Sequence, residues 1–109
     1  MPGQIKSDPI IQDFLHQISR WRPGIRQLIV FGSRARGDAR PDSDYDILVV
    51  VGSKTRELQD ALYDAVMDTL LNSGRLISLK IFPQFEFDRL MKLSTPFMQR
   101  VREEGVALE

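Results

Sequence analysis

The stretch that decides the fold covers residues 28–50 and reads LIVFGSRARGDARPDSDYDILVV. It begins inside an apolar, β-branched run over residues 25–31, which predicts a buried strand. Gly32-Ser33 then breaks this strand abruptly. A second apolar run predicts another strand over residues 45–51. The stretch therefore predicts two strands of a small sheet, joined by a polar connection that contains glycine and proline.

Helical spacing of apolar residues, together with end signals such as Pro and Gly, predicts the elements around these two strands. Helices are expected over residues 8–21, 33–38, 54–71, 86–93 and 96–104, and a third strand over 76–82. This order predicts an α/β (α+β) fold, with a small mixed β-sheet flanked by helices, as a single domain over residues 1–109. Some charged residues of the last helix are expected on a solvated face: Arg100, Arg102, Glu103 and Glu104.

The overall composition excludes several classes of function. Lys plus Arg equals Asp plus Glu, at 15 each, so the net charge near zero argues against a nucleic-acid coat or a polybasic membrane binder. The absence of cysteine excludes disulfides, thiol catalysis and Cys-type zinc sites. No apolar run is long enough to span a membrane, and no signal peptide is recognised, so a cytoplasmic location is expected.

Asp44 and Asp46 are the candidate catalytic and metal-binding residues. At positions i and i+2 of a strand, their side chains would leave the same face, with Cα atoms roughly 7 Å apart. Two carboxylates held in this way repel each other unless a cation lies between them. Hard oxygen ligands beside a phosphate-bearing substrate favour Mg²⁺ or Mn²⁺. Aspartate pairs at strand starts are also common as solvated turn formers, so the pair alone is ambiguous.

Gly32 and Ser33 are the candidate phosphate-binding residues. A strand that ends in glycine lets a phosphate approach the backbone, and free N–H groups and the serine hydroxyl can bind an anion. Arg34 and Arg36 follow directly and can offset the charge of a triphosphate. Most Gly-Ser pairs are plain turns, but a Gly-Ser followed by ten residues and Asp-x-Asp is a far more specific pattern.

This pattern resembles the signature of the minimal nucleotidyltransferases, which belong to the DNA polymerase beta-type nucleotidyltransferase superfamily. Gly32-Ser33, ten intervening residues and Asp44-Tyr45-Asp46 carry the resemblance. The lead-in strand, the run over residues 33–38 and the tail over residues 96–106 are also similar to this family. The resemblance thus extends from about residue 25 to the end of the sequence.

The resemblance implies a reaction and a partner. In the family, the glycine-serine turn holds the triphosphate, and the two aspartates bind metal and activate an acceptor hydroxyl for attack on the α-phosphate. Carried over, Gly32 and Ser33 would hold ATP or another nucleoside triphosphate, and Asp44 and Asp46 would bind metal. Freestanding members are often encoded beside a HEPN-domain protein as its antitoxin. The expected reaction is AMP transfer to a hydroxyl of such a partner, because the small size of the chain favours a protein acceptor.

One departure from the family concerns a third carboxylate, which usually lies on a later strand. Alternation on the strand over residues 76–82 puts Ser78 and Lys80 on one face, and no Asp or Glu lies on that strand. Three alternatives follow. Two aspartates suffice; Asp38 or Asp42 moves in; or the chain binds nucleotide without turnover and neutralises a partner by complex formation.

The chain length itself predicts a partner. A domain of 109 residues has little room for both a nucleotide site and an acceptor site. We therefore expect a partner protein, or a second copy of the chain in a homo-oligomer, to help complete the site.

Overall fold

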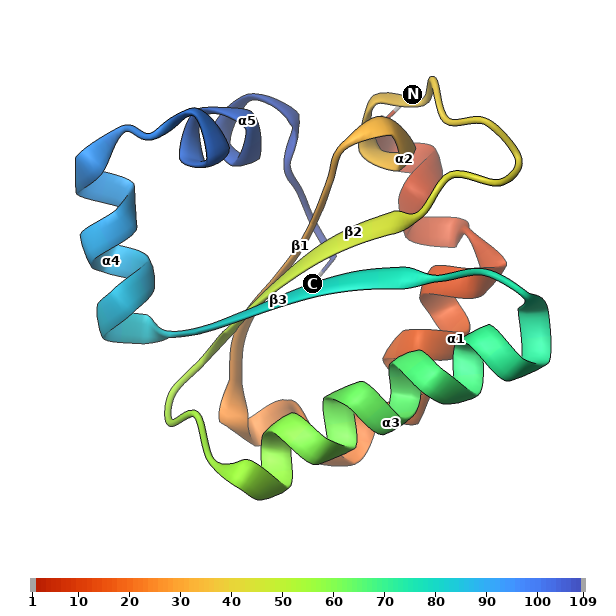
Figure 1. Cartoon of the computed structure of the whole chain (residues 1–109), viewed down its shortest axis with the longest axis horizontal. Coiled ribbons are helices and arrows are strands. Elements are labelled where there is room, and N and C mark those ends of the chain that lie inside the picture. The colour runs from red at the N-terminus through yellow and green to blue at the C-terminus, as the bar shows by residue number, and fades with distance from the viewer. Residues whose placement is uncertain (1, 109) are drawn as a thin grey trace.

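The structure is a computed structural model that describes residues 2–108 (Figure 1). Its elements are, in chain order, the 3₁₀-helix η1 (Pro2–Ser7), α1 (Pro9–Gln17), the 3₁₀-helix η2 (Ser19–Gly24), β1 (Ile25–Phe31), α2 (Ser33–Arg36), β2 (Tyr45–Val51), α3 (Arg56–Ser73), β3 (Ile77–Pro83), α4 (Gln84–Leu93), α5 (Pro96–Glu104) and β4 (Val106–Ala107). The predicted bounds of β1, β2 and α5 are confirmed.

The four strands form one sheet in the order β3-β2-β1-β4. β1 runs antiparallel to both β2 and β4, whereas β2 and β3 are parallel. Parallel neighbours need a crossover connection, and α3 supplies it between β2 and β3 (Figure 1). The small mixed sheet with flanking helices that the sequence predicts is thereby confirmed.

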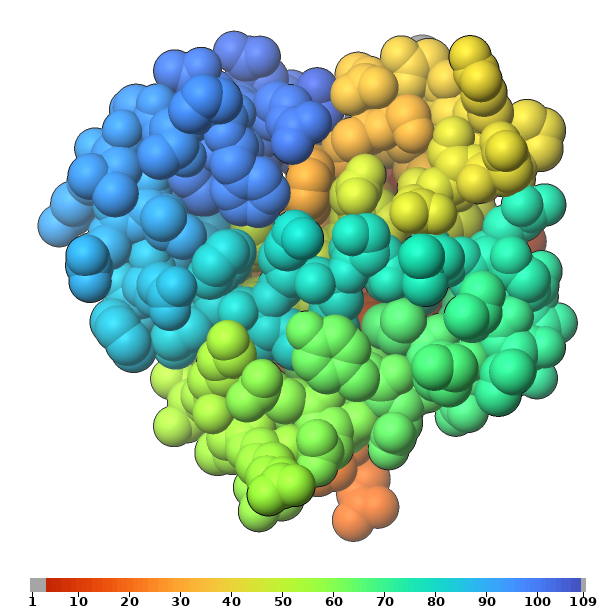
Figure 2. Space-filling model, viewed as in Figure 1, coloured from red at the N-terminus to blue at the C-terminus, as the bar shows by residue number. Residues whose placement is uncertain are grey.

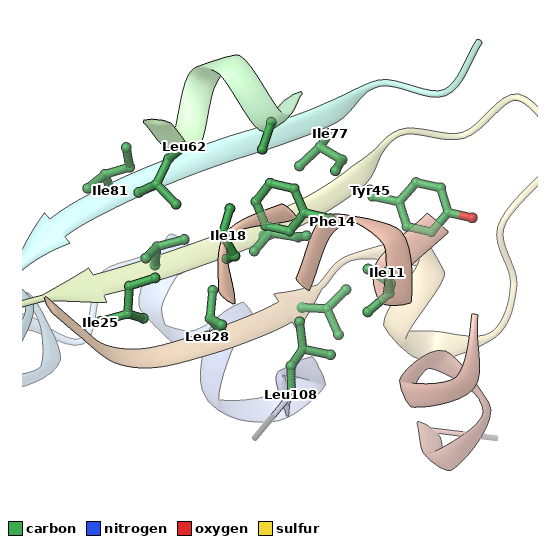
Figure 3. Close-up of a cluster of buried hydrophobic side chains, with 14 of the residues drawn as sticks. Ile11, Phe14, Ile18, Ile25, Leu28, Tyr45, Leu62, Ile77, Ile81 and Leu108 are labelled. Atoms are coloured by element: carbon green, nitrogen blue, oxygen red, sulfur yellow. The ribbon is translucent and has the colours of Figure 1, made fainter. Parts of the chain in front are cut away.

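One face of the sheet carries the larger hydrophobic core, which α1 and α3 cover (Figures 1 and 3). Alternate residues of β2 point into it, because successive side chains of a strand leave opposite faces. Tyr45 is among them. Residues of the helices, the sheet and the C-terminal segment meet in this cluster, including Ile11, Phe14, Ile18, Leu28, Ile47, Val49, Leu62, Ile77, Ile81 and Leu108.

The opposite face carries a smaller hydrophobic cluster under α4 and α5. Phe31, Leu48 and Val50 of the sheet pack there against Phe87, Met98 and Val101 of the two helices. The rings of Phe31 and Phe97 meet edge to face, with centroids 5.5 Å apart. Asp46 leaves the strand on this same face, two positions before Leu48, the first apolar residue that β2 contributes to it. The smaller cluster therefore borders the candidate site.

The predicted helix over residues 8–21 is wrong in its second half. α1 begins where Asp8 caps it, since the Asp8 carboxylate accepts hydrogen bonds from the backbone N–H groups of Ile10 and Ile11. It ends at Gln17, and the chain continues as the 3₁₀-helix η2, which contains Pro23. Proline lacks the N–H that an α-helix needs and disfavours helical geometry in the preceding residue.

Candidate functional site

Gly32 forms the turn at which β1 ends and α2 begins. Its φ of +77° lies in the region that favours glycine, and its backbone is buried. A Cβ atom added to Gly32 would lie 2.3 Å from Oδ2 of Asp46. Backbone conformation and space therefore both require glycine here. The close approach also shows that the two halves of the sequence motif meet in the fold.

The two candidate metal-binding aspartates differ in their surroundings. Asp44 is exposed and lies just before β2, so the expected placement of both residues on the strand is wrong for Asp44. Asp46 is half-buried and lies in register with Phe31 of β1 and Ser78 of β3. Burial raises the pKa of the Asp46 carboxyl, and the negative charge of Asp44 raises it further.

Two basic residues lie close enough to Asp46 to act on it electrostatically. The positive charges of Arg100 on α5 and Lys80 on β3 lower the pKa of Asp46, against the larger effect of burial. Lys80 occupies the face that its alternation with Ser78 predicts, and Arg100 is exposed, as expected for a solvated helix face. The space-filling view shows a hollow between α5 (blue) and the chain around α2 (orange) (Figure 2). Its walls thus come from segments far apart in the sequence.

Glu104, the last residue of α5, takes part in the site although the sequence predicted it on a solvated face. Its Oε2 accepts a hydrogen bond of 3.2 Å from the backbone N–H of Gly32. Its Oε1 accepts one of 3.0 Å from Nη1 of Arg36. Only 17% of the Glu104 side chain is exposed, and its charge contributes to the raised pKa of Asp46. The end of α5 is thus tied to the glycine turn.

Arg34 binds the loop between α2 and β2. Its guanidinium donates to the carbonyl oxygen of Ser43 at 2.9 and 3.3 Å and to that of Pro41 at 3.1 Å. It also lies over the ring of Tyr45, at 4.3 Å from the centroid. The Tyr45 hydroxyl in turn donates to the Asp8 carboxylate at 2.9 Å. These contacts hold the loop that precedes the aspartates; phosphate binding by Arg34 stays a prediction.

Arg36 makes two contacts with carboxylates. Its Nε donates to Oδ2 of Asp38 at 3.1 Å, and its Nη1 donates to Glu104. The hydrogen bonds with Asp38 and Glu104 raise the pKa of the Arg36 guanidinium. Phosphate binding by Arg36 stays a prediction, but the structure joins this side chain to the glycine turn through Glu104.

Asp44 and Asp46 are the two carboxylates of the site that suit a hard divalent cation, since Glu104 is bound to Gly32 and Arg36. Asp46 is half-buried beside a second carboxylate, and a cation between the two would relieve their repulsion. Within residues 2–108, no group of three His, Cys, Asp or Glu residues is placed to hold a metal ion. Ser78 lies opposite Asp46 on β3, Asp38 is bound to Arg36, and Asp42 is exposed.

Glu104 and Arg100 are the site residues that reasoning from the sequence missed. Gly32 and Glu104 are 72 residues apart, so no local pattern joins them. The signal that could have found them is the similarity of the tail over residues 96–106 to the same family as the central motif.

Comparisons with known proteins identify the family. The profile of the nucleotidyltransferase domain family matches residues 11–105. A protein of Methanocaldococcus jannaschii named "Putative protein adenylyltransferase" is 32% identical over 109 residues, which cover 95% of this chain and 99% of that protein. These two matches confirm the predicted enzyme class.

Solved structures agree in fold. A chain of a toxin–antitoxin crystal structure with AMP-PNP superposes with a TM-score of 0.62 at 16% identity, over 90% of this chain and 71% of that one. A chain of the crystal structure of a mutant toxin–antitoxin MntA–HpeT superposes with a TM-score of 0.62 at 17% identity, over 90% of this chain and 71% of that one. Family profile, relative and fold therefore lead to one conclusion: the chain belongs to the nucleotidyltransferase domain family.

Proposed function

We propose that this nucleotidyltransferase transfers AMP from ATP to a hydroxyl group of a partner protein, with Mg²⁺ or Mn²⁺ held by Asp44 and Asp46. One observation carries the proposal. Gly32 lies so close to Asp46 that a Cβ atom on it would be 2.3 Å from the carboxylate oxygen. This proximity supports the proposal, because a joint metal–triphosphate site requires the phosphate-binding turn to adjoin a metal-binding carboxylate.

Different residues around the turn would contact the phosphate oxygens and offset the charge of the triphosphate. The Gly32 N–H is donated to Glu104, so the Ser33 hydroxyl and the N–H groups after Gly32 would bind phosphate oxygens. Lys80 and Arg100, rather than the loop-bound Arg34, would offset the triphosphate charge, because their charges act at Asp46. Catalysis then depends on positioning and charge, which a small domain can provide.

The proposed reaction is an in-line displacement at the α-phosphorus. The acceptor oxygen forms a bond to this phosphorus, and the bond to the oxygen that bridges to the β-phosphate breaks. Pyrophosphate leaves with that oxygen. The proton of the acceptor hydroxyl passes to a carboxylate of the Asp44–Asp46 pair. A divalent cation, when bound there, supplies charge neutralisation for the triphosphate.

The nature of the acceptor is supported by the relatives. One is named a protein adenylyltransferase, and the chains with the same fold come from toxin–antitoxin structures. We therefore propose that the acceptor is a HEPN-domain toxin and that this chain acts as its antitoxin. No helix within residues 2–108 is long and apolar enough to cross a membrane. The cytoplasmic location stays a prediction, as does a homo-oligomer.

Transfer of label tests the proposal. The protein is incubated with Mg²⁺ and ATP labelled in the α-phosphate, with and without the protein encoded beside it. We expect label on that neighbour, and we expect the double variant Asp44→Asn, Asp46→Asn to lose it. The matched control is the double variant Asp60→Asn, Asp64→Asn on the exposed face of α3, which should transfer label like the wild type.

The second candidate function is a binding module that neutralises a partner by contact, with a vestigial nucleotide site. The observation that favours it is Ser78, which lies in register with Asp46 where relatives are expected to carry a third carboxylate. The same experiment separates the two functions. If no label transfers under any condition, while a tight complex with the neighbour survives the Asp44, Asp46 double variant, the binding module is correct.

A further inference from the structure

Glu104 lies outside the sequence motif but forms hydrogen bonds with two residues of the motif segment. One carboxylate oxygen accepts from the Gly32 N–H at 3.2 Å, and the other accepts from Arg36 at 3.0 Å. Gly105, the next residue, fits tightly: a Cβ atom there would lie 2.3 Å from the carbonyl oxygen of Val101 and 2.8 Å from Cγ2 of Ile29. The end of α5 therefore holds the Glu104 carboxylate against the turn.

The position of this carboxylate raises an electrostatic problem. A carboxylate at hydrogen-bonding distance from Gly32 stands beside the proposed triphosphate site, and like charges there would weaken nucleotide binding. Arg36 offsets this charge through a charge-assisted hydrogen bond. The side chain of Arg36 is 42% exposed and also contacts Asp38, so it lies at the rim of the site.

We propose that Glu104 is a positioning residue for the phosphate-binding turn, and that Arg36 supports nucleotide binding by neutralising Glu104 rather than by contacting phosphate. The inference rests on the proposed function, because it assumes that the triphosphate binds at Gly32 and Ser33. It changes the role that the sequence predicted for Arg36. It also makes a distinctive claim: removal of the Glu104 charge compensates for loss of Arg36.

Equilibrium binding of an ATP analogue tests this claim without any chemistry. The probe is the Mg²⁺ complex of ATP with a methylene bridge between the α- and β-phosphates, which cannot be cleaved there, and calorimetry measures its Kd. We expect Arg36→Gln to raise the Kd on the order of tenfold, because it removes the positive charge that neutralises the Glu104 carboxylate. Glu104→Gln keeps an acceptor for the Gly32 N–H and should change the Kd about two- to threefold.

The double variant Arg36→Gln, Glu104→Gln decides the matter. We expect its Kd to return to within about threefold of the wild type. Arg36→Lys, which keeps the charge, should stay in the same range, and Glu103→Gln on the exposed side of the same helix end is the matched control. Thermal melting of each variant, which should stay near the wild type for these isosteric or exposed changes, separates local effects from unfolding.

Direct phosphate contact by Arg36 predicts the opposite pattern. In that case the double variant binds at least as weakly as Arg36→Gln, and the inference is overturned while the nucleotide site stands. An Arg36→Gln variant that binds like the wild type also overturns it. If the wild-type protein itself does not bind the analogue, the proposed function has failed, and this outcome is distinguishable because it does not depend on any variant.

Discussion

The two faces of the sheet use the same strand for different purposes. On the face covered by α1 and α3, β2 contributes Tyr45, Ile47 and Val49 to the larger hydrophobic core. On the opposite face it contributes Asp46 first, and only then Leu48 and Val50 to the smaller cluster. The first face is apolar along the whole strand, whereas the second changes from polar to apolar within three residues.

This difference shows how a small domain keeps a polar site rigid. The larger core stabilises β2 through the side chains that the strand buries against α1 and α3. The opposite face of the strand can therefore carry the half-buried carboxylate of Asp46 while β2 stays folded. The smaller cluster positions α5, whose Glu104 reaches the glycine turn. The larger core thus lies on one face and the candidate site on the other, and variants should separate the two.

The largest expected effect is on the core face. Phe14 of α1 is fully buried (0% exposed), so Phe14→Ala removes a large side chain and leaves a cavity. We expect a loss of about 3–5 kcal/mol in the free energy of unfolding, measured by urea denaturation. Phe85→Ala on α4 is the matched control, since Phe85 is 68% exposed and should change stability by less than about 0.5 kcal/mol. Equal losses for the two variants would contradict the assignment of the core.

The second-largest effect is expected at Gly32, which ends β1 and adjoins Asp46. Gly32→Ala combines an unfavourable φ with a clash against Asp46, so we expect a loss of about 2–3 kcal/mol and no detectable binding of the ATP analogue. Gly74→Ala is the control: Gly74 has a similar φ of +73°, but nothing lies within 4 Å of its added Cβ. It should lose only about 1 kcal/mol and keep nucleotide binding. Similar losses for both variants would mean that contact with Asp46 is unimportant.

A smaller effect is expected at Arg34, which binds carbonyl groups of the loop between α2 and β2. Arg34→Lys cannot reproduce the donation to both Ser43 and Pro41 or the stacking on Tyr45, so we expect a loss of about 1 kcal/mol in stability. Affinity for the ATP analogue should stay within about threefold of the wild type, as measured by calorimetry. A tenfold loss of affinity at unchanged stability would instead make Arg34 a phosphate ligand.

The smallest effect concerns the charge of Asp46 in the absence of divalent cations. Its pKa is raised in the folded protein, so the ionised carboxylate destabilises the fold, and stability is lost as the pH rises through this raised pKa. Asp46→Asn removes that cost, and we expect Tm to rise by about 2–5 °C at neutral pH. The gain should vanish at acidic pH, where the wild-type carboxyl is protonated in both states. A gain that persists at acidic pH would point to a cause other than charge; Asp64→Asn, on α3, is the control.

Patterns within short segments of the sequence predicted those helices and strands whose bounds are determined by nearby residues. β1 and β2 are rich in apolar and β-branched residues, and Gly32 ends the first of them, so their bounds followed from the sequence. The helix over residues 8–21 was wrong beyond Gln17, because apolar spacing continued through Ile18 and Trp21, which the chain places at the start of and within a 3₁₀-helix rather than an α-helix. β4 was missed because two residues, Val106 and Ala107, are too short for any periodic signal.

The candidate site was predictable only in part for a similar reason. The meeting of Gly32 with Asp46 was expected, since one short segment carries both. The contacts of Arg34 were not, because a long side chain binds whichever carbonyl groups the loop presents, and the loop shape was not predictable. Glu104 contacts Gly32 across 72 residues, and only the folded chain reveals that pair.

That long separation has a consequence for the order in which the protein is made. The ribosome synthesises Gly32 well before Glu104, and at about 5–20 residues per second the 72 positions from one to the other take roughly 4 to 14 s. During this interval the glycine turn lacks the carboxylate that holds it. The nascent chain therefore acquires this hydrogen bond, and with it the finished form of the turn, only after residue 104 has been synthesised.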